Sequence, residues 1–138
     1  MAVHSGLLRL STAGNGEIVD ITEGVLSVVR TSGAQVGLVS VFATGSTVAI
    51  TTMEYEPGGV ADLRSVLDRL IPAGDDYEHN RLNHDTNAHA HLRAAVIGPS
   101  ETVPLVGGRL VLGTWQQVVL IDFDDRPRTR TVTVHVVS

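Results

Sequence analysis

Runs of apolar residues with period-two alternation or with many β-branched members predict strands in most parts of the chain. Each run is bounded by Gly, Pro, Asn, Asp or other small polar residues that favour turns. Only Gly45-Ser46 separates two of the runs, which predicts that these two strands lie side by side. The expected strands are residues 6–11, 35–44, 47–55, 102–105, 109–112, 114–122 and 130–137.

Three segments instead carry apolar residues at the helical spacings of three and four. A polar residue that can cap a helix precedes two of them, and glycine or proline ends each one. The His-rich segment before the third helix is expected to begin as a loop. The expected helices are 23–30, capped by Thr22 and ended by Gly33; 60–70, after residues 57–59 break the preceding strand and before Pro72; and 88–97, capped by Asn87 and ended by Gly98-Pro99.

Strands outnumber helices in this pattern, and the short spacing between the last strands favours hairpins over helical crossovers. The predicted fold class is therefore α+β, a mostly antiparallel sheet with two or three helices packed on it. The chain has 138 residues, 43% of them hydrophobic, and shows no internal repeat or linker. That length suits one core, so we expect residues 1–138 to form a single domain.

Composition excludes several kinds of chemistry and partner. The chain has no cysteine and no lysine, which removes disulfides, thiolate ligands, Schiff bases and the lysine of a phosphate-binding P-loop. A net charge of −5 without a basic run argues against nucleic acid. No apolar run approaches the roughly 20 residues of a membrane helix, and the first residues do not read as a signal peptide. A soluble, cytoplasmic protein is expected.

The most unusual polar segment is residues 79–91, which holds four of the six histidines together with Asp85. Such a cluster suits a metal site or a proton-transfer site, and a hydrophilic loop that happens to be His-rich is the alternative. His89 and His91 would point about 200° apart on a helix and could not bind one ion, whereas an extended segment would place them on one face. No familiar zinc spacing is present.

Three further positions allow both a functional and a structural interpretation. Glu54 ends an apolar strand, where its carboxylate can face inward or be an ordinary strand-end charge. Asp62 lies near the start of a predicted helix, where the helix dipole alone favours an acid. Trp115 is the only tryptophan, and a core Trp with Gln116 on the opposite strand face is its structural interpretation.

The order and spacing of several motifs resemble the YjbQ family, whose members are also called secondary thiamine-phosphate synthases. The resemblance covers nearly the whole chain, and the Gly-Thr-Trp-Gln block together with the His-rich segment is specific. The motifs are Ser46-Thr47, Ile50-Thr51-Thr52-Met53-Glu54, Asp62-Leu63, Tyr77-Glu78-His79, Asp85, Ala90-His91-Leu92, Gly98-Pro99-Ser100, Val103-Pro104, Gly108-Arg109-Leu110, Leu112-Gly113-Thr114-Trp115-Gln116 and Asp122 to Arg130.

This resemblance implies an α+β homotrimer with a polar pocket near the subunit boundaries that holds a metal ion or an anion. By matching positions, His79 and His91, with His89 as a further candidate, are the expected metal ligands. The expected carboxylate partners are Glu54, Asp62 and Asp85, and the expected residues for a phosphate or other anionic substrate are Ser46, Thr47, Ser100, Trp115, Gln116 and Arg130.

One position departs from the family pattern. Many relatives carry a histidine immediately before the paired hydroxyl residues, and this chain has Gly45 there. We hypothesise that His84 or His89 takes the place of the missing imidazole.

The resemblance leads to two functional expectations. The first is a small metal-assisted enzyme, using a divalent ion such as Zn²⁺ or Mg²⁺, that acts on phosphorylated or pyrophosphorylated small molecules. Thiamine-phosphate synthesis is its possible secondary activity, since that reaction gains from a metal and from phosphate-binding groups. The usual enzyme for it is a barrel that this chain is too short to form. The alternative is a non-enzymatic trimer that binds an anionic metabolite or a metal ion.

Overall fold

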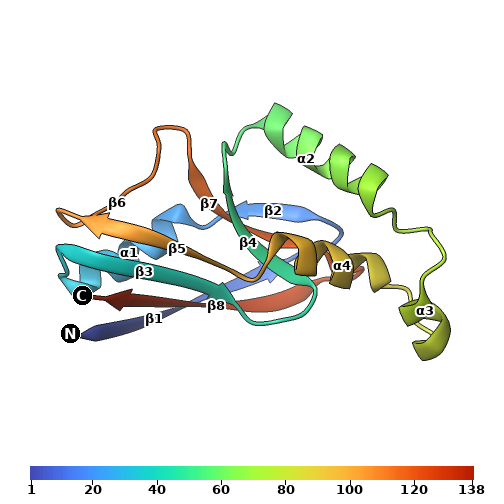
Figure 1. Ribbon diagram of the computed structural model, residues 1–138, viewed down its shortest axis with the longest axis horizontal. Coiled ribbons are helices and arrows are strands. Elements are labelled where there is room, and N and C mark those ends of the chain that lie inside the picture. Colours follow the sequence, from blue (N-terminus) through green and yellow to red (C-terminus); the bar gives the residue numbers. More distant parts are fainter.

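Eight strands form two antiparallel sheets in the computed structural model, which describes residues 1–138 (Figure 1). The α+β class predicted from the sequence is confirmed. The five-stranded sheet has the order β1 (Val3–Thr12), β8 (Arg128–Val137), β3 (Val36–Ala43), β5 (Ser100–Val106) and β6 (Arg109–Leu110). The three-stranded sheet has the order β2 (Glu17–Asp20), β7 (Gln117–Asp122) and β4 (Val48–Met53).

Four helices complete the fold: α1 (Thr22–Ser32), α2 (Pro57–Leu70), α3 (Glu78–Asn83) and α4 (Ala88–Ile97). The three predicted helices are present, and Gly33 ends α1 in the left-handed conformation that glycine permits. None of the four is long and apolar enough to cross a membrane.

Two local predictions about helix starts are wrong. Residues 57–59 were expected to lie before the second helix, but they form the first turn of α2, because the Glu56 carboxylate accepts hydrogen bonds from the N–H groups of Gly58 and Gly59. Thr22 lies inside α1 and not at its cap. Its hydroxyl instead bonds Asp20 and accepts from the Val118 N–H of β7, so it joins α1 to the three-stranded sheet.

The His-rich segment also differs from the prediction, since it contains the short helix α3. A left-handed residue, His84, ends α3, and α4 begins four residues later. Figure 1 shows this pair of helices at the end of the molecule opposite to both chain termini.

The predicted adjacency of the strands before and after Gly45-Ser46 is wrong, because β3 and β4 belong to different sheets. The hairpin expected between the last two strands is also absent, since β7 and β8 belong to different sheets and do not pair. The reason is that β4 and β7 are buried on both faces: Ile50 and Leu120 pack against the five-stranded sheet and α1, while Ala49 and Ile121 pack towards α2 and α4. The three-stranded sheet is therefore the middle layer.

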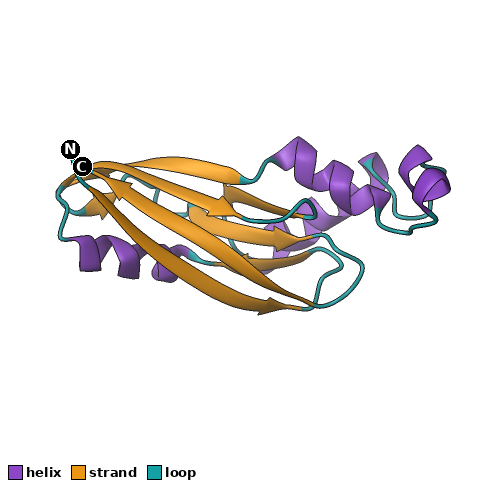
Figure 2. Cartoon of the chain, turned by 90° about the horizontal axis from the view of Figure 1, so that it is seen from below, coloured by secondary structure: helices purple, strands orange, loops and turns teal.

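The five-stranded sheet has one buried face and one open face. On the open face, register places Val3, Val137, Leu38 and Pro104 in one row across β1, β8, β3 and β5. Val3 and Leu38 are more than half exposed. Figure 2 shows the helices gathered at the two ends of the strands. We call this surface the open sheet face; its large exposed apolar residues are Val3, Leu7, Val36, Leu38, Phe42 and Val106.

Candidate functional site

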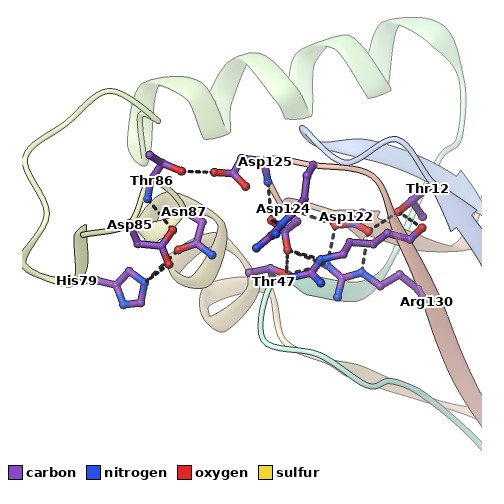
Figure 3. Close-up of polar contacts among 12 residues, drawn as sticks. Thr12, Thr47, His79, Asp85, Thr86, Asn87, Asp122, Asp124, Asp125 and Arg130 are labelled. Carbon is purple, nitrogen blue, oxygen red and sulfur yellow. Dashed lines mark hydrogen bonds and ion pairs between the residues drawn. The ribbon is translucent and has the colours of Figure 1, made fainter. Parts of the chain in front are cut away.

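Packing of α3 against α4 brings two of the predicted histidines together. The ring centroids of His79 and His91 are 4.7 Å apart, with the ring planes inclined by 56°. His79 Nε2 lies 3.0 Å from Asn87 Oδ1 and 3.7 Å from a carboxylate oxygen of Asp85 (Figure 3). Asn87 sits at the N-cap of α4 but makes no capping bond with its side chain, because that side chain holds His79.

The contact with Asn87 decides how His79 can react. An amide oxygen only accepts, so Nε2 of His79 carries the proton and donates to it. In the neutral ring the lone pair is then on Nδ1. This atom is available to a proton or to a metal ion, and the Asn87 and Asp85 side chains fix the ring as polar partners commonly fix metal-binding imidazoles.

Two hollows adjoin His91, one on each side. The first, of about 270 Å³, lies between α4 and the loop from β3 to β4, and its lining includes Gly45, Ser46 and Pro99. The second, of about 360 Å³, lies between α3 and α4 and is lined by Tyr77, Glu78, His79, Ala88, His91 and Leu92. His91 is thus the one side chain shared by a hollow at the predicted anion residues and a hollow at the histidine pair.

The structure does not bring His89 to this pair. Because α4 begins at Ala88, His89 and His91 lie in the same helix and their side chains diverge. His89 is buried, its Nδ1 has no hydrogen-bond partner, and burial, followed by the charge of Arg93, lowers its pKa. The exposed His84 ends α3. Neither His84 nor His89 lines the hollow beside Gly45.

Of the three predicted carboxylates, Asp85 alone contacts the histidine pair. Glu54 follows β4 and Asp62 lies in α2, and both are exposed. No group of three or more His, Asp or Glu side chains in the chain is arranged to hold a metal ion. A single chain therefore offers two imidazoles and one nearby carboxylate at this site, which is fewer than a complete ligand set.

Arg130, one of the predicted anion residues, is buried with a 6% exposed fraction in a network that the sequence did not reveal (Figure 3). Its Nε and Nη2 atoms donate to the two carboxylate oxygens of Asp122 at 2.7 and 2.8 Å. Nη2 also donates to the Thr47 hydroxyl, 2.7 Å away, which in turn donates to Asp124. The Thr47 hydroxyl therefore uses its proton and one of its lone pairs on protein partners.

The contacts of this network lower the pKa of both its carboxylates. Burial raises the pKa of Asp122, but hydrogen bonds from Arg130 and Thr12 outweigh burial and bring its pKa below the ordinary value. Burial likewise opposes ionisation of Asp124, yet Arg128 and Thr47 lower its pKa to about 2. The sequence did carry one signal of this network: Asp122 and Asp124 stand at the end of an apolar run. Their carboxylates must find partners once that strand is buried.

The remaining predicted residues lie at two places. Ser46 lines the hollow beside His91, and Ser100 begins β5 directly after Pro99. Gln116 fixes the loop before β7 by donating to the Thr52 hydroxyl and accepting from the Gly113 N–H. Trp115 is 70% exposed in that loop, so its interpretation as a core residue is wrong.

Comparison with known families gives a match over residues 7–138 to the family described as UPF0047 protein YjbQ-like. The chain belongs to this family. A UPF0047 protein of Methanothermobacter thermautotrophicus is 39% identical over 136 residues, which are 99% of this chain and 93% of that protein. One of Archaeoglobus fulgidus is 42% identical over 127 residues, or 92% of this chain and 96% of the relative.

Solved structures of UPF0047 relatives share the fold. A protein of Sulfolobus solfataricus, described as YbjQ-like and of unknown function, has a TM-score of 0.93 and 35% identity and covers 98% of this chain and 96% of its own. A UPF0047 protein of Clostridium acetobutylicum has a TM-score of 0.87 and 34% identity, with 95% and 98% of the two chains covered. The two sheets and four helices are therefore the family fold.

Proposed function

We propose that this chain is a small metal-assisted enzyme acting on phosphorylated or pyrophosphorylated small molecules. The observation that carries the proposal is the position of His91 between two hollows. One hollow adjoins Gly45 and Ser46, where an anionic group fits; the other adjoins His79 and Leu92, where an organic group fits. An imidazole between them is placed to transfer a proton to or from the atom that joins the two groups.

The site supplies part of the ligand set that the proposed metal ion would need. His79 has a free Nδ1 and the polar contacts of a metal-binding imidazole, and His91 is adjacent to it. Asp85 is the nearest carboxylate, while Glu54 and Asp62 could join only from another copy of the chain. When bound, a divalent ion would neutralise charge on a phosphoryl group. Imidazoles favour Zn²⁺, whereas Mg²⁺ prefers oxygen ligands.

Replacing His91 by alanine tests this proposal. We expect loss of metal content, measured by elemental analysis, and at least about a hundredfold loss of turnover on a panel of phosphate and pyrophosphate esters. His4→Ala, in β1, is the matched control and should change neither. Retention of metal or turnover by the His91 variant would contradict the proposal. Thiamine-phosphate synthesis from its two phosphorylated precursors belongs in the panel as the possible secondary activity.

A non-enzymatic anion-binding protein is the second candidate. The observation that favours it is the incomplete ligand set of the single chain. A thermal-shift screen with thiamine precursors, nucleotides and phosphosugars separates the two candidates, because ligands that stabilise the protein without being converted indicate a binder.

We further propose that the chain assembles as a homotrimer and that the open sheet face takes part in the contact. Apolar side chains in one continuous row are unusual on the surface of a soluble monomer. Leu38 is central in this row, with Val137 on one side and Pro104 on the other.

Replacing Leu38 by glutamate should therefore dissociate the assembly, since a carboxylate would be buried at the contact without a partner. Light scattering coupled to size exclusion should give about three times the chain mass of 14.6 kDa for the natural protein and a single chain mass for the variant. Leu70→Glu, at the exposed end of α2, is the control. A monomeric natural protein, or a variant that stays trimeric, would refute the use of this face.

A further inference from the structure

A small hollow lies under α2, away from the two hollows beside His91. It is bounded by α2, α4, the three-stranded sheet and the turn from β1 to β2. Its volume is about 100 Å³, which is room for a group of about three heavy atoms at roughly 30 Å³ each. Its apolar lining is less than a tenth exposed and consists of Ile18, Leu67, Ile121 and Phe123.

Arg93 of α4 lines this hollow, although its side chain is only 8% exposed. Its Nε and Nη2 atoms donate to the Ile71 carbonyl oxygen at 3.0 and 2.7 Å, and Nη2 also donates to Asp68 at 3.2 Å. These contacts hold the C-terminal end of α2 and are the structural role of Arg93. They leave Nη1 with two N–H bonds that no protein group uses. Nη1 is not sealed off, because the one buried side-chain atom without a partner is His89 Nδ1.

Arg64 of α2 lines the same hollow and makes no ion pair. Its one hydrogen bond, 3.3 Å long, runs from Nη2 to the carbonyl oxygen of Asn15. Asp68 is the only acid in the lining, and its carboxylate is 71% exposed and bonded to Arg93. Two guanidiniums and one carboxylate therefore give this hollow a net positive charge above a buried apolar floor.

A larger hollow of about 360 Å³ adjoins the first and shares Asn15, Ile18 and Arg64 with it. Val60 and Glu17 also line this larger hollow. The Glu17 carboxylate accepts a hydrogen bond from the N–H of residue 13, so it is held at the wall. A ligand that extends from the small hollow into the large one therefore meets cations first and then an acid, which favours an anionic head and an uncharged body.

We propose that the hollow under α2 binds the carboxylate of a small organic acid, whose uncharged body occupies the adjoining hollow. A carboxylate has three heavy atoms and one negative charge, and the free N–H groups of Arg64 and Arg93 match its two oxygens. The apolar floor strengthens this attraction by lowering the local dielectric constant. A phosphate group would bring a second negative charge close to Asp68.

This site is separate from the one proposed around His91. Arg93 follows His91 by two residues in α4, so the two side chains leave the helix in different directions. No residue lines both the hollows under α2 and the hollows beside His91. The acid site is thus a second function of the chain, and its test does not depend on the first.

Titration with a model acid tests the assignment. 3-Phenylpropionate is added to ¹⁵N-labelled full-length protein while the side-chain Nε–H signals of Arg64 and Arg93 are followed. We expect both signals to shift, and Arg64→Gln to weaken binding at least about tenfold, since a charge-assisted hydrogen bond is lost. Arg69→Gln, at an exposed position of the same helix, is the matched control and should bind as the natural protein does.

Four results would overturn the proposal. Unshifted Arg64 and Arg93 signals in the natural protein would exclude the site even if the Arg64 variant fails to fold. Equal affinity of the Arg64→Gln and Arg69→Gln proteins would do the same, as would equal binding of the uncharged 3-phenyl-1-propanol. Tighter binding of phenyl phosphate than of 3-phenylpropionate at these signals would refute the carboxylate assignment. The His91→Ala protein should bind 3-phenylpropionate with natural affinity, which separates this site from the proposed enzyme.

Discussion

Replacing Arg130 by alanine is expected to lower the free energy of unfolding by about 3 to 5 kcal/mol, the largest effect of any single change considered for this protein. Removal of the guanidinium would leave the Asp122 carboxylate buried without its main partner and the Thr47 hydroxyl without a donor. A buried charge that loses its partner is far less stable than either the pair or an apolar replacement of the pair.

Urea unfolding followed by circular dichroism measures this loss. The matched control is Arg126→Ala, because Arg126 is 65% exposed and its nitrogen is 4.0 Å from Asp124. Although Asp124 is buried, a long contact from a mostly exposed arginine contributes less than about 1 kcal/mol. If Arg130→Ala were no less stable than the control, Asp122 would have to be solvated or protonated in the native protein, contrary to the structure.

Acid should destabilise the protein through the same network. The folded pKa of Asp124, about 2, is below its ordinary value of 3.8, so the carboxylate contributes stability that is fully present above the ordinary value. That contribution is lost as the pH falls from about 4 through the folded pKa, and it amounts to about 2 kcal/mol. The lowered pKa of Asp122 acts with the same sign in the same region.

Free energies of unfolding measured between pH 5 and pH 2 check this expectation. Asp124→Asn should be less stable at pH 5 and should lose part of the acid dependence, because it cannot gain a proton in this range. Asp75→Asn is the control, since Asp75 is exposed in the loop before α3. An Asp124→Asn protein that keeps the full acid dependence would assign the effect to other carboxylates.

Periodicity predicted three of the four helices, since α1, α2 and α4 place apolar residues at helical spacings that the sequence displays directly. It missed α3, which buries none of its residues. The ends of α2 and α4 follow from Pro72 and Gly98 for the same local reason. Strand pairing was predicted poorly. An apolar run such as Val118-Val119-Leu120-Ile121 has no alternation because both of its faces are buried, and nothing local says which sheet it joins.

The sequence likewise predicted some features of the proposed site and missed others. The sequence singled out His79, His91 and Arg130, but it could not show that Arg130 is mostly engaged by Asp122 or that Asn87 orients His79. These contacts join residues from different elements, and their geometry exists only after the layers have packed.

Residue identity and spacing alone determined the α+β class, the positions of three helices, the family membership and the absence of thiol and lysine chemistry. Only the tertiary structure decided that β4 and β7 form a middle layer, that His89 lies apart from the pair of His79 and His91, and that Gly45 packs against the Arg130 guanidinium. The physical reason is that helix periodicity and caps are local properties of the chain. The partner of a buried charge or amide is instead set by whichever distant segment packing brings within hydrogen-bond distance.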